Sequence, residues 1–392
     1  MKQRHDLPFP IPEYEYRLSE VRRNMEQRGI DVMMVSSPEN VFYLTGFETT
    51  GYTSFQALFI PLEAEPFIVT RILENTGVQN FSWIEQSRPY ADGDDPLIRT
   101  REVLEEFNLQ QKQIGYERNA WFFSISQQEK LFAVCSDATF VDCSGLIEGI
   151  RAIKSDLEIM KIREAARLTE IAIQSGIKAA GAGIRDTFVA AEMHHAMIQA
   201  GSDYPADAPY IASGHRSAIG HAKWSGRTID VGDCVFLEPS GCQQHYHAPC
   251  MRTGFIGEPT LVQREAEKII KEAVEATIAA IKPGAVAEEV DAVNRNIIGK
   301  NTIGLQQLAQ SAYPVGIAFP PGWFEGTFSL RPKETQCLQP NMVFHLIPWG
   351  LVPGEFAMGL SETIRVTDTG CEVITKLPRE VFVKSPVSTM SV

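Results

Sequence analysis

The chain has 392 residues, which is enough for two domains of unequal size. Hydrophobic residues make up 44% and charged residues 22% of the chain, near the averages for soluble proteins, and no uncharged apolar run is long enough to cross a membrane. The formal charge is -13 and Lys and Arg do not cluster, which argues against nucleic-acid binding. These numbers predict a soluble protein that binds neither nucleic acid nor membrane.

The N-terminus and the cysteines both bear on the cellular compartment. The first 18 residues have no apolar stretch between their early charges and the first predicted helix, so a secretory signal is unsupported. The seven cysteines are an odd number without a CxxC pair, a pattern typical of free thiols in a reducing compartment. We therefore expect a cytoplasmic location.

Helices and strands alternate along the first part of the chain. Apolar residues at helical spacing predict a helix over residues 13–28, and residues 31–37 resemble a buried strand. A short helix and turn over 38–46 and a strand over 57–60 continue the alternation. The pattern predicts an α/β N-terminal domain over residues 1–150.

A second domain begins with a capping box, in which Ser155 and Glu158 can satisfy free N–H groups at a helix start. The helices predicted for this domain span residues 156–177, 188–200, 263–281 and 287–298. The predicted strands span residues 234–237, 251–256, 342–347 and 362–367. We expect an α+β domain over residues 151–392, with helices on one side of a mixed sheet.

Several ionisable residues are candidates for chemistry. His221 lies in a glycine-bearing loop, and Glu238 ends a predicted strand, where active sites often open. The ordinary alternatives are a solvated imidazole and a surface carboxylate. On an extended chain, His245 and His247 point to one face and could bind zinc with Glu238, or they could belong to a polar hairpin. His345 lies inside an apolar strand and faces either core or cleft.

An aromatic loop spans residues 319–326 and contains Phe319, Trp323 and Glu325. Aromatic faces and a carboxylate together stabilise an amidinium or ammonium ion, although a loop that covers the core is the alternative. In the first domain, residues 51–55 likewise join an aromatic side chain to hydroxyl groups beside a glycine.

Taken in order, several segments resemble the creatinase and proline-aminopeptidase superfamily, whose C-terminal domain has the pita-bread fold. The segments are 13–18, 29–31, 37–47, 153–158 and 281–284. The resemblance implies a creatinase-type α/β N-terminal domain and a pita-bread catalytic domain. It also implies a homodimer in which Tyr52 reaches the partner's pocket. In that family a substrate-contacting histidine precedes a Gly-Asp turn, and His221 matches this histidine in its spacing to Gly232-Asp233.

Metal-dependent members of the superfamily use five ligands: two Asp, one His and two Glu. The residues near these positions here are Glu238, Pro249, Val315, Ile347 and either Ser361 or Glu362. One or two oxygen ligands cannot hold two hard cations against water. The resemblance therefore implies an enzyme that uses neither a metal nor another cofactor.

Four segments, 52–55, 319–323, 344–346 and 361–363, look like the ectoine hydrolase branch of the superfamily. Ectoine is a cyclic amidine that bears a carboxylate. The branch implies ring opening of ectoine, or of hydroxyectoine, to N-acetyl-2,4-diaminobutyrate, with a deacetylase as a downstream partner. The guanidine-binding glutamates of creatinase fall at Met251 and Ile347, so creatine fits poorly.

The resemblance implies roles for particular residues. We expect Glu238 and Glu362 to hold the amidinium, with His221 as general base and then acid. Attack on the ring carbon comes either from water or from Glu238 as a nucleophile. The expected substrate-binding residues are Tyr52, Ser54, Arg216, Arg252, Phe319, Trp323 and His345. The alternatives are a creatinase-like amidinohydrolase, an Xaa-Pro metallopeptidase and a non-catalytic binding module.

Overall fold

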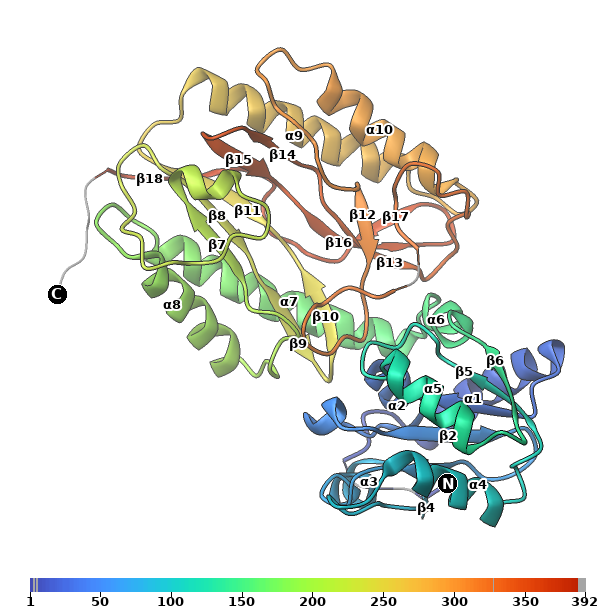
Figure 1. Ribbon diagram of the computed structural model, residues 1–392. Helices are drawn as coiled ribbons and strands as arrows, with labels where there is room; N and C mark the ends of the chain where they lie inside the picture. The colour runs from blue at the N-terminus through green and yellow to red at the C-terminus, as the bar shows by residue number, and fades with distance from the viewer. Residues whose placement is uncertain (3, 5, 327, 387–392) are drawn as a thin grey trace. The chain divides into compact units, whose positions relative to one another are not determined.

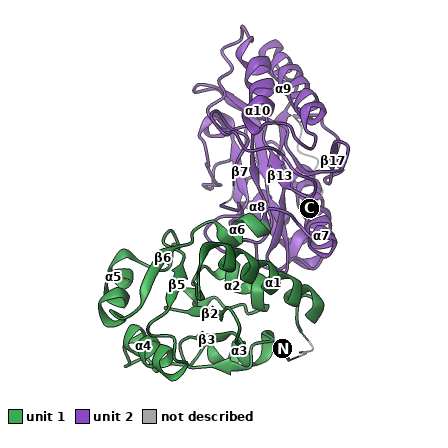
Figure 2. Ribbon diagram, turned by 90° about the vertical axis from the view of Figure 1, so that its right-hand side faces the viewer, with its two compact units in different colours: residues 1–151 green, residues 152–392 purple. Residues whose placement is uncertain are grey.

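The computed structural model describes residues 1–386 except 3, 5 and 327. The chain forms two compact units, residues 1–151 and residues 152–392 (Figure 2). Each unit has its own β-structure and its own buried core.

The N-terminal unit is built on one six-stranded sheet. Its strands are β1 (Val32–Val35), β2 (Ala57–Pro61), β3 (Phe67–Val69), β4 (Gln86–Ser87), β5 (Gln113–Tyr116) and β6 (Thr139–Asp142). Its helices are α1 (Ile11–Arg28), α2 (Pro38–Thr45), η1 (Gly51–Thr53), α3 (Asn75–Phe81), α4 (Pro96–Glu106), α5 (Ile125–Val134) and α6 (Leu146–Arg151). The strand order is β4-β3-β2-β1-β5-β6, and β1 pairs antiparallel with β2 but parallel with β5.

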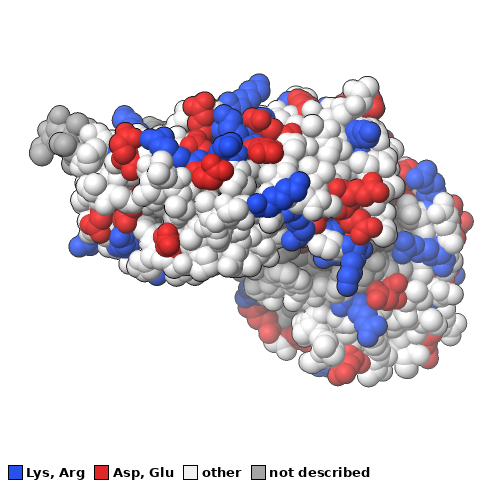
Figure 3. Space-filling view, turned by 90° about the horizontal axis from the view of Figure 1, so that it is seen from above, with Lys and Arg blue, Asp and Glu red and all other residues white. Residues whose placement is uncertain are grey.

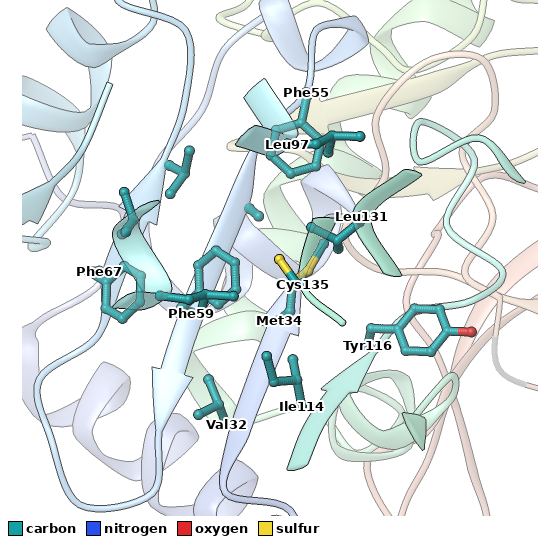
Figure 4. Packing of buried hydrophobic residues seen from close by; sticks show 14 of the residues in the cluster. Val32, Met34, Phe55, Phe59, Phe67, Leu97, Ile114, Tyr116, Leu131 and Cys135 are labelled. Carbon is teal, nitrogen blue, oxygen red and sulfur yellow. The ribbon is translucent and has the colours of Figure 1, made fainter. Parts of the chain in front are cut away.

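Short-range signals in the sequence account for the first elements of this unit. Gly29 ends α1 in the left-handed conformation, with φ of 67°, and its N–H bonds to the carbonyl of Glu26. Side chains from β1, β2 and β3 then meet in the buried core, as Met34, Phe59 and Phe67 show in Figure 4. The predicted alternation of helices and strands is confirmed.

The C-terminal unit contains twelve strands and four α-helices among its described residues. The strands are β7 (Tyr210–Ser213), β8 (Cys234–Glu238), β9 (Ser240–Gln243), β10 (Tyr246–Pro249), β11 (Arg252–Ile256), β12 (Ala312–Pro314), β13 (Val343–Leu346), β14 (Trp349–Val352), β15 (Phe356–Gly359), β16 (Glu362–Val366), β17 (Cys371–Val373) and β18 (Phe382–Lys384). The helices are α7 (Asp156–Ala179), α8 (Asp186–Gln199), the short η2 (Gly214–Ala218), α9 (Leu261–Ala280) and α10 (Ala287–Gly299).

These strands form two four-stranded sheets and two hairpins instead of the single mixed sheet that we predicted. The sheet orders are β18-β11-β8-β7 and β12-β13-β16-β17, and the hairpins are β9-β10 and β14-β15. The helices α7 and α8 pack together on one side of the unit, and α9 and α10 run side by side on another (Figure 1). Two helix pairs thus cover the strands, because one pair cannot bury the apolar faces of both sheets.

The helix α7 shows how the sequence sets this packing. Ser155 and Glu158 form the predicted capping box, in which each side chain accepts a hydrogen bond from the other residue's backbone N–H. The apolar stripe that follows is buried, and Leu168 packs in one cluster with Val235 and Leu237 of β8. The helix therefore supports the strand that carries Glu238 at its end.

Candidate active site

A cavity of about 750 Å³ opens in the C-terminal unit. Side chains that can take part in chemistry line it from β7, β8, β12 and the loops between them. The polar residues of the lining include Asp207, Tyr210, His221, Glu238, Tyr313 and Arg331. Several apolar and aromatic residues complete the wall, so the cavity has the character of a small-molecule site.

Glu238 ends β8 opposite Tyr210, the first residue of β7 in the register of the pair. Its side chain is 12% exposed. Burial raises the pKa of Glu238 to about 8, and the negative charge of Asp207 adds to the rise. Among the described residues, no Lys or Arg side chain pairs with Glu238. A positively charged ligand in the cavity would therefore stabilise its ionised form.

Asp207 is another carboxylate of the cavity, which Glu325 also lines. Its Oδ2 accepts a hydrogen bond from Tyr210 Oη over 2.5 Å, and its Oδ1 accepts from Lys223 Nζ. The Lys223 ammonium also lies 5.0 Å from the Tyr210 ring centroid. These contacts fix Asp207 and commit the Tyr210 hydroxyl hydrogen to it.

His221 lies at the cavity wall and is exposed. Its backbone has a φ of 59°, the left-handed region that few non-glycine residues adopt. Its ring stands 5.3 Å from the Tyr210 ring. An exposed imidazole at the mouth of a cavity can exchange protons with both substrate and water.

Trp323 and Tyr313 form the aromatic side of the cavity. The Trp323 indole stands edge-on to Tyr210, with ring centroids 5.2 Å apart, and donates from Nε1 to Tyr313 Oη over 2.8 Å. Tyr313 in turn lies 2.7 Å from His345 Nδ1. Sequence reasoning named Trp323 but missed Asp207, Tyr210 and Tyr313. No local motif shows the strand register that places Tyr210 opposite Glu238 and Tyr313 opposite His345, or the loop that brings Asp207 beside Tyr210.

His345 is fully buried in β13, directly opposite Tyr313 of β12. Its Nε2 lies 2.6 Å from Ser361 Oγ, and its Nδ1 lies 4.0 Å from Glu238 Oε1. Burial lowers the pKa of His345 to about 3, and the charge of Arg252 adds to the effect. His345 therefore stands behind the cavity lining as a neutral ring.

Arg252 and Glu362 lie outside the cavity lining and bind each other. Arg252 Nη2 donates to Glu362 Oε1 over 2.8 Å, and the two side chains are 2% and 1% exposed. Arg252 also donates to four backbone carbonyls, those of Met251, Ser361, Leu377 and Pro378. The donors of this guanidinium are committed to the protein, and neither Arg252 nor Glu362 is among the residues that line the cavity.

The remaining predicted site residues are also outside the cavity lining. Arg216 lies in η2 and donates to the carbonyl of Lys223 over 3.3 Å. Phe319 is buried and stacks on His245, with ring centroids 4.0 Å apart. Tyr52 and Ser54 belong to the N-terminal unit, where Tyr52 packs on Phe122. The role of Tyr52 in a partner's pocket stays a prediction.

The interpretation of His245 and His247 as a zinc pair does not fit the structure. The chain is not extended at His245, whose φ is 63°, so the alternation rule fails there. His247 Nε2 accepts from the backbone N–H of Ala206 over 2.9 Å, and its Nδ1 lies 2.7 Å from the His245 carbonyl. Both ring nitrogens of His247 are therefore used in holding the hairpin.

Comparison with known proteins fixes the family. Residues 17–153 match the creatinase/prolidase N-terminal domain, and residues 160–368 match metallopeptidase family M24. The chain belongs to the M24 family. It is 30% identical to the ectoine hydrolase of Halomonas elongata, over 96% of this chain and 99% of that protein. It is 27% identical to the Xaa-Pro dipeptidase of Pyrococcus furiosus, over 93% of this chain and 99% of that protein.

Solved structures of M24 relatives share the whole fold. The match to the prolidase of Pyrococcus horikoshii OT3 covers 94% of this chain and 100% of the prolidase chain, with a TM-score of 0.82 and 24% identity. The predicted α/β N-terminal domain and pita-bread C-terminal domain are thus confirmed. M24 membership and these relatives also make the protein a hydrolase.

The residues of this M24 protein do not fit the two-metal centre that the family name implies. Three of the positions near the family's ligands hold Pro249, Val315 and Ile347, whose side chains have no ligating atom. Ile347 packs with Met251 and Phe236 in an apolar cluster at the cavity wall. Within the described residues, no three His, Cys, Asp or Glu side chains lie together as a metal site. The side chains at these positions offer too few oxygen ligands to hold two divalent cations.

Charged side chains of both signs are interspersed on one face of the molecule. On the face shown in Figure 3, Lys and Arg side chains lie among Asp and Glu side chains, separated by uncharged areas. Basic residues form no continuous patch on that face. Over the described residues, every helix is too short or too polar to span a membrane.

Proposed function

We propose that this M24 protein is a metal-independent hydrolase that opens the ring of a small cyclic amidine, with ectoine as the substrate. The observation that carries the proposal is Glu238, a carboxyl of raised pKa at the wall of an aromatic cavity, beside apolar residues where family metal ligands would stand. The 30% identity to an ectoine hydrolase over nearly the whole chain supports the same substrate.

The cavity suits a planar cation. Ionised Glu238 would pair with the amidinium, and Asp207 adds negative potential from the same side. The rings of Tyr210 and Trp323 present aromatic surface to it, and cation–π contacts contribute about 0.5–2 kcal/mol each. Met251 and Ile347 supply apolar contact for the methyl and methylene groups of such a ring.

A cation is also needed for the substrate carboxylate. Arg252 is committed to Glu362, and Arg216 lies outside the lining, so neither predicted residue serves. Arg331 lines the cavity, is 57% exposed and makes a 3.4 Å ion pair with Glu334. We assign the carboxylate to Arg331, because an exposed guanidinium can change partners at little cost.

Hydrolysis forms one C–O bond and breaks one C–N bond. On the direct route, His221 takes a proton from the water whose oxygen adds to the amidine carbon, and returns it to the ring nitrogen as the C–N bond breaks. On the covalent route, a Glu238 oxygen adds to that carbon and protonated His221 gives its proton to the departing ring nitrogen. Water then adds, His221 takes its proton, and the C–O bond to Glu238 breaks. On both routes the ring nitrogen leaves as an amine. The product carries an amide in place of the amidine, as in N-acetyl-2,4-diaminobutyrate, and a deacetylase is the class of enzyme that would consume it.

One assay tests the proposal. The purified protein is incubated with ectoine, creatine or Ala-Pro, with and without excess chelator, and the products are identified by mass. We expect ectoine alone to gain one water, at a rate that the chelator does not change. Cleavage of Ala-Pro that stops with chelator would make the protein an Xaa-Pro dipeptidase. Binding of ectoine without turnover by the wild type would make it a binding module.

A further inference from the structure

A chain of hydrogen bonds runs from the buried core to the cavity through Tyr313. The phenol oxygen of Tyr313 accepts from Trp323 Nε1 over 2.8 Å and lies 2.7 Å from His345 Nδ1. On the other side of the His345 imidazole, Nε2 lies 2.6 Å from Ser361 Oγ. Ser361 Oγ also accepts from the backbone N–H of Met251 over 2.6 Å. His345 and Ser361 are fully buried, whereas Tyr313 lines the cavity.

The single N–H of the His345 ring decides the direction of each hydrogen bond in this network. A neutral His345 carries one N–H, on Nδ1 or on Nε2. In the described part of the chain, Ser361 Oγ contacts the Met251 N–H and the His345 ring. If Nε2 carried the hydrogen, the Ser361 hydroxyl hydrogen would stay buried without an acceptor, at a cost of about 1–3 kcal/mol. Ser361 therefore donates to Nε2, and Nδ1 carries the hydrogen.

This assignment fixes the hydroxyl of Tyr313. Trp323 and His345 both donate to Tyr313 Oη, so the phenol hydrogen is directed at neither of them. It is left for the cavity that Tyr313 lines. The second cavity phenol, Tyr210, differs because its hydrogen is donated to Asp207.

We propose that Tyr313 is a catalytic hydrogen-bond donor to the oxygen that adds to the substrate carbon, and that His345 and Ser361 are positioning residues. The inference rests on the proposed amidine hydrolysis. An amidinium has no oxygen at its central carbon, so Tyr313 gains a hydrogen bond to the substrate itself only as the C–O bond forms. The phenol keeps its proton throughout, and its contribution belongs to the transition state and not to substrate binding.

Kinetics of Tyr313→Phe test the catalytic role. The added oxygen becomes a neutral hydroxyl, so loss of this hydrogen bond should lower kcat by about 3–10-fold, and we expect KM for ectoine to change by less than about threefold. Tyr210→Phe is the matched control, since it removes a cavity hydroxyl already bound to Asp207, and its loss of kcat should be smaller. An unchanged kcat in Tyr313→Phe, or a rise in KM alone, would overturn the inference.

The positioning residues have a readout that does not require turnover. In ¹⁵N-histidine NMR of the whole protein, with the His345 signal identified by its loss in His345→Asn, we expect the Nδ1–H tautomer. Ser361→Ala should release the ring and lower kcat, although Ser361 is outside the cavity lining. His345→Asn can still donate to Tyr313 and should keep more activity than His345→Leu.

The outcomes separate this inference from the proposed function. If the wild type hydrolyses none of the probes, the proposed function fails, while the NMR tautomer still decides the direction of the Tyr313 hydroxyl. An Nε2–H tautomer in the wild type would overturn the inference whether or not the enzyme is active. An active enzyme with the Nδ1–H tautomer and a kcat defect in Tyr313→Phe supports both.

Discussion

Arg252 Nη2 donates to Glu362 Oε1 across 2.8 Å, and this buried pair joins β11 of one sheet to β16 of the other. Glu362 also accepts from Arg379 Nε over 3.1 Å and from the Thr375 hydroxyl. The two residues were predicted to hold substrate, but their contacts tie the two four-stranded sheets of the C-terminal unit together.

The first prediction concerns this pair. Glu362→Gln leaves the buried Arg252 without its carboxylate partner, so it should lower the free energy of unfolding by about 3–5 kcal/mol in urea titrations. Arg252→Met should cost less, because Glu362 keeps its ion pair with Arg379. Arg264→Met is the control, because the exposed Arg264–Glu258 pair contributes at most about 1 kcal/mol. Wild-type stability with lost turnover in Glu362→Gln would restore Glu362 to the catalytic residues.

The pairing of Arg252 with Glu362 also shows where sequence reasoning stops. Both residues were singled out because the family resemblance placed them near the expected site. Their partners depend on how two sheets face each other, and residues 110 positions apart carry no local signal of that contact. The same limit explains why Asp207, Tyr210 and Tyr313 were missed.

Local signals were reliable where the physics is local. The capping box at Ser155 and Glu158 and the end of the first helix at Arg28 were predicted from sequence and are present. The alternation rule failed at His245, because positive φ values at Gln244 and His245 turn the chain there. The family resemblance supplied the fold and placed His221, which no property of the isolated residue could have done.

The second prediction follows from the raised pKa of Glu238. A cationic substrate needs Glu238 ionised, and in the free protein its pKa is about 8. The value of kcat/KM for ectoine should therefore rise with pH and level off above about 8, because kcat/KM reports groups of the free enzyme. The bound cation favours the carboxylate, so kcat should level off at lower pH. Glu238→Gln should remove the inflection along with the activity.

Stability should respond to Glu238 in the opposite sense. The pKa is raised from 4.5 when unfolded to about 8 when folded, so the folded state binds the extra proton between these values. Stability from this group is full below pH 4.5 and is lost as pH rises to about 8. Glu238→Gln does not titrate, so its Tm should exceed that of wild type increasingly from pH 5 to 8. Each kcal/mol corresponds to about 2–4 °C. A gap that shrinks with pH would contradict the raised pKa.

His221 gives a prediction about rate alone. A histidine general base contributes about 10²–10⁴-fold, so His221→Asn should lower kcat within that range. Asn tolerates the left-handed backbone at this position, and the residue is exposed, so the Tm should stay near wild type. His215→Asn is the control, since His215 is exposed on η2 and outside the cavity lining. Wild-type turnover in His221→Asn would exclude it from proton transfer.

Arg331 gives a prediction about binding. If its guanidinium holds the substrate carboxylate, Arg331→Met should raise KM for ectoine by about 10–100-fold, since hydrogen bonds to charged groups contribute about 1.5–3 kcal/mol. A cyclic amidine without the carboxylate should bind wild type and variant alike, because it has nothing for Arg331 to contact. Comparing the two substrates in both proteins forms a double-mutant cycle that isolates this one contact. Equal losses for both substrates would mean that Arg331 only shapes the cavity wall, and the carboxylate would then need a partner from outside the residues that line it.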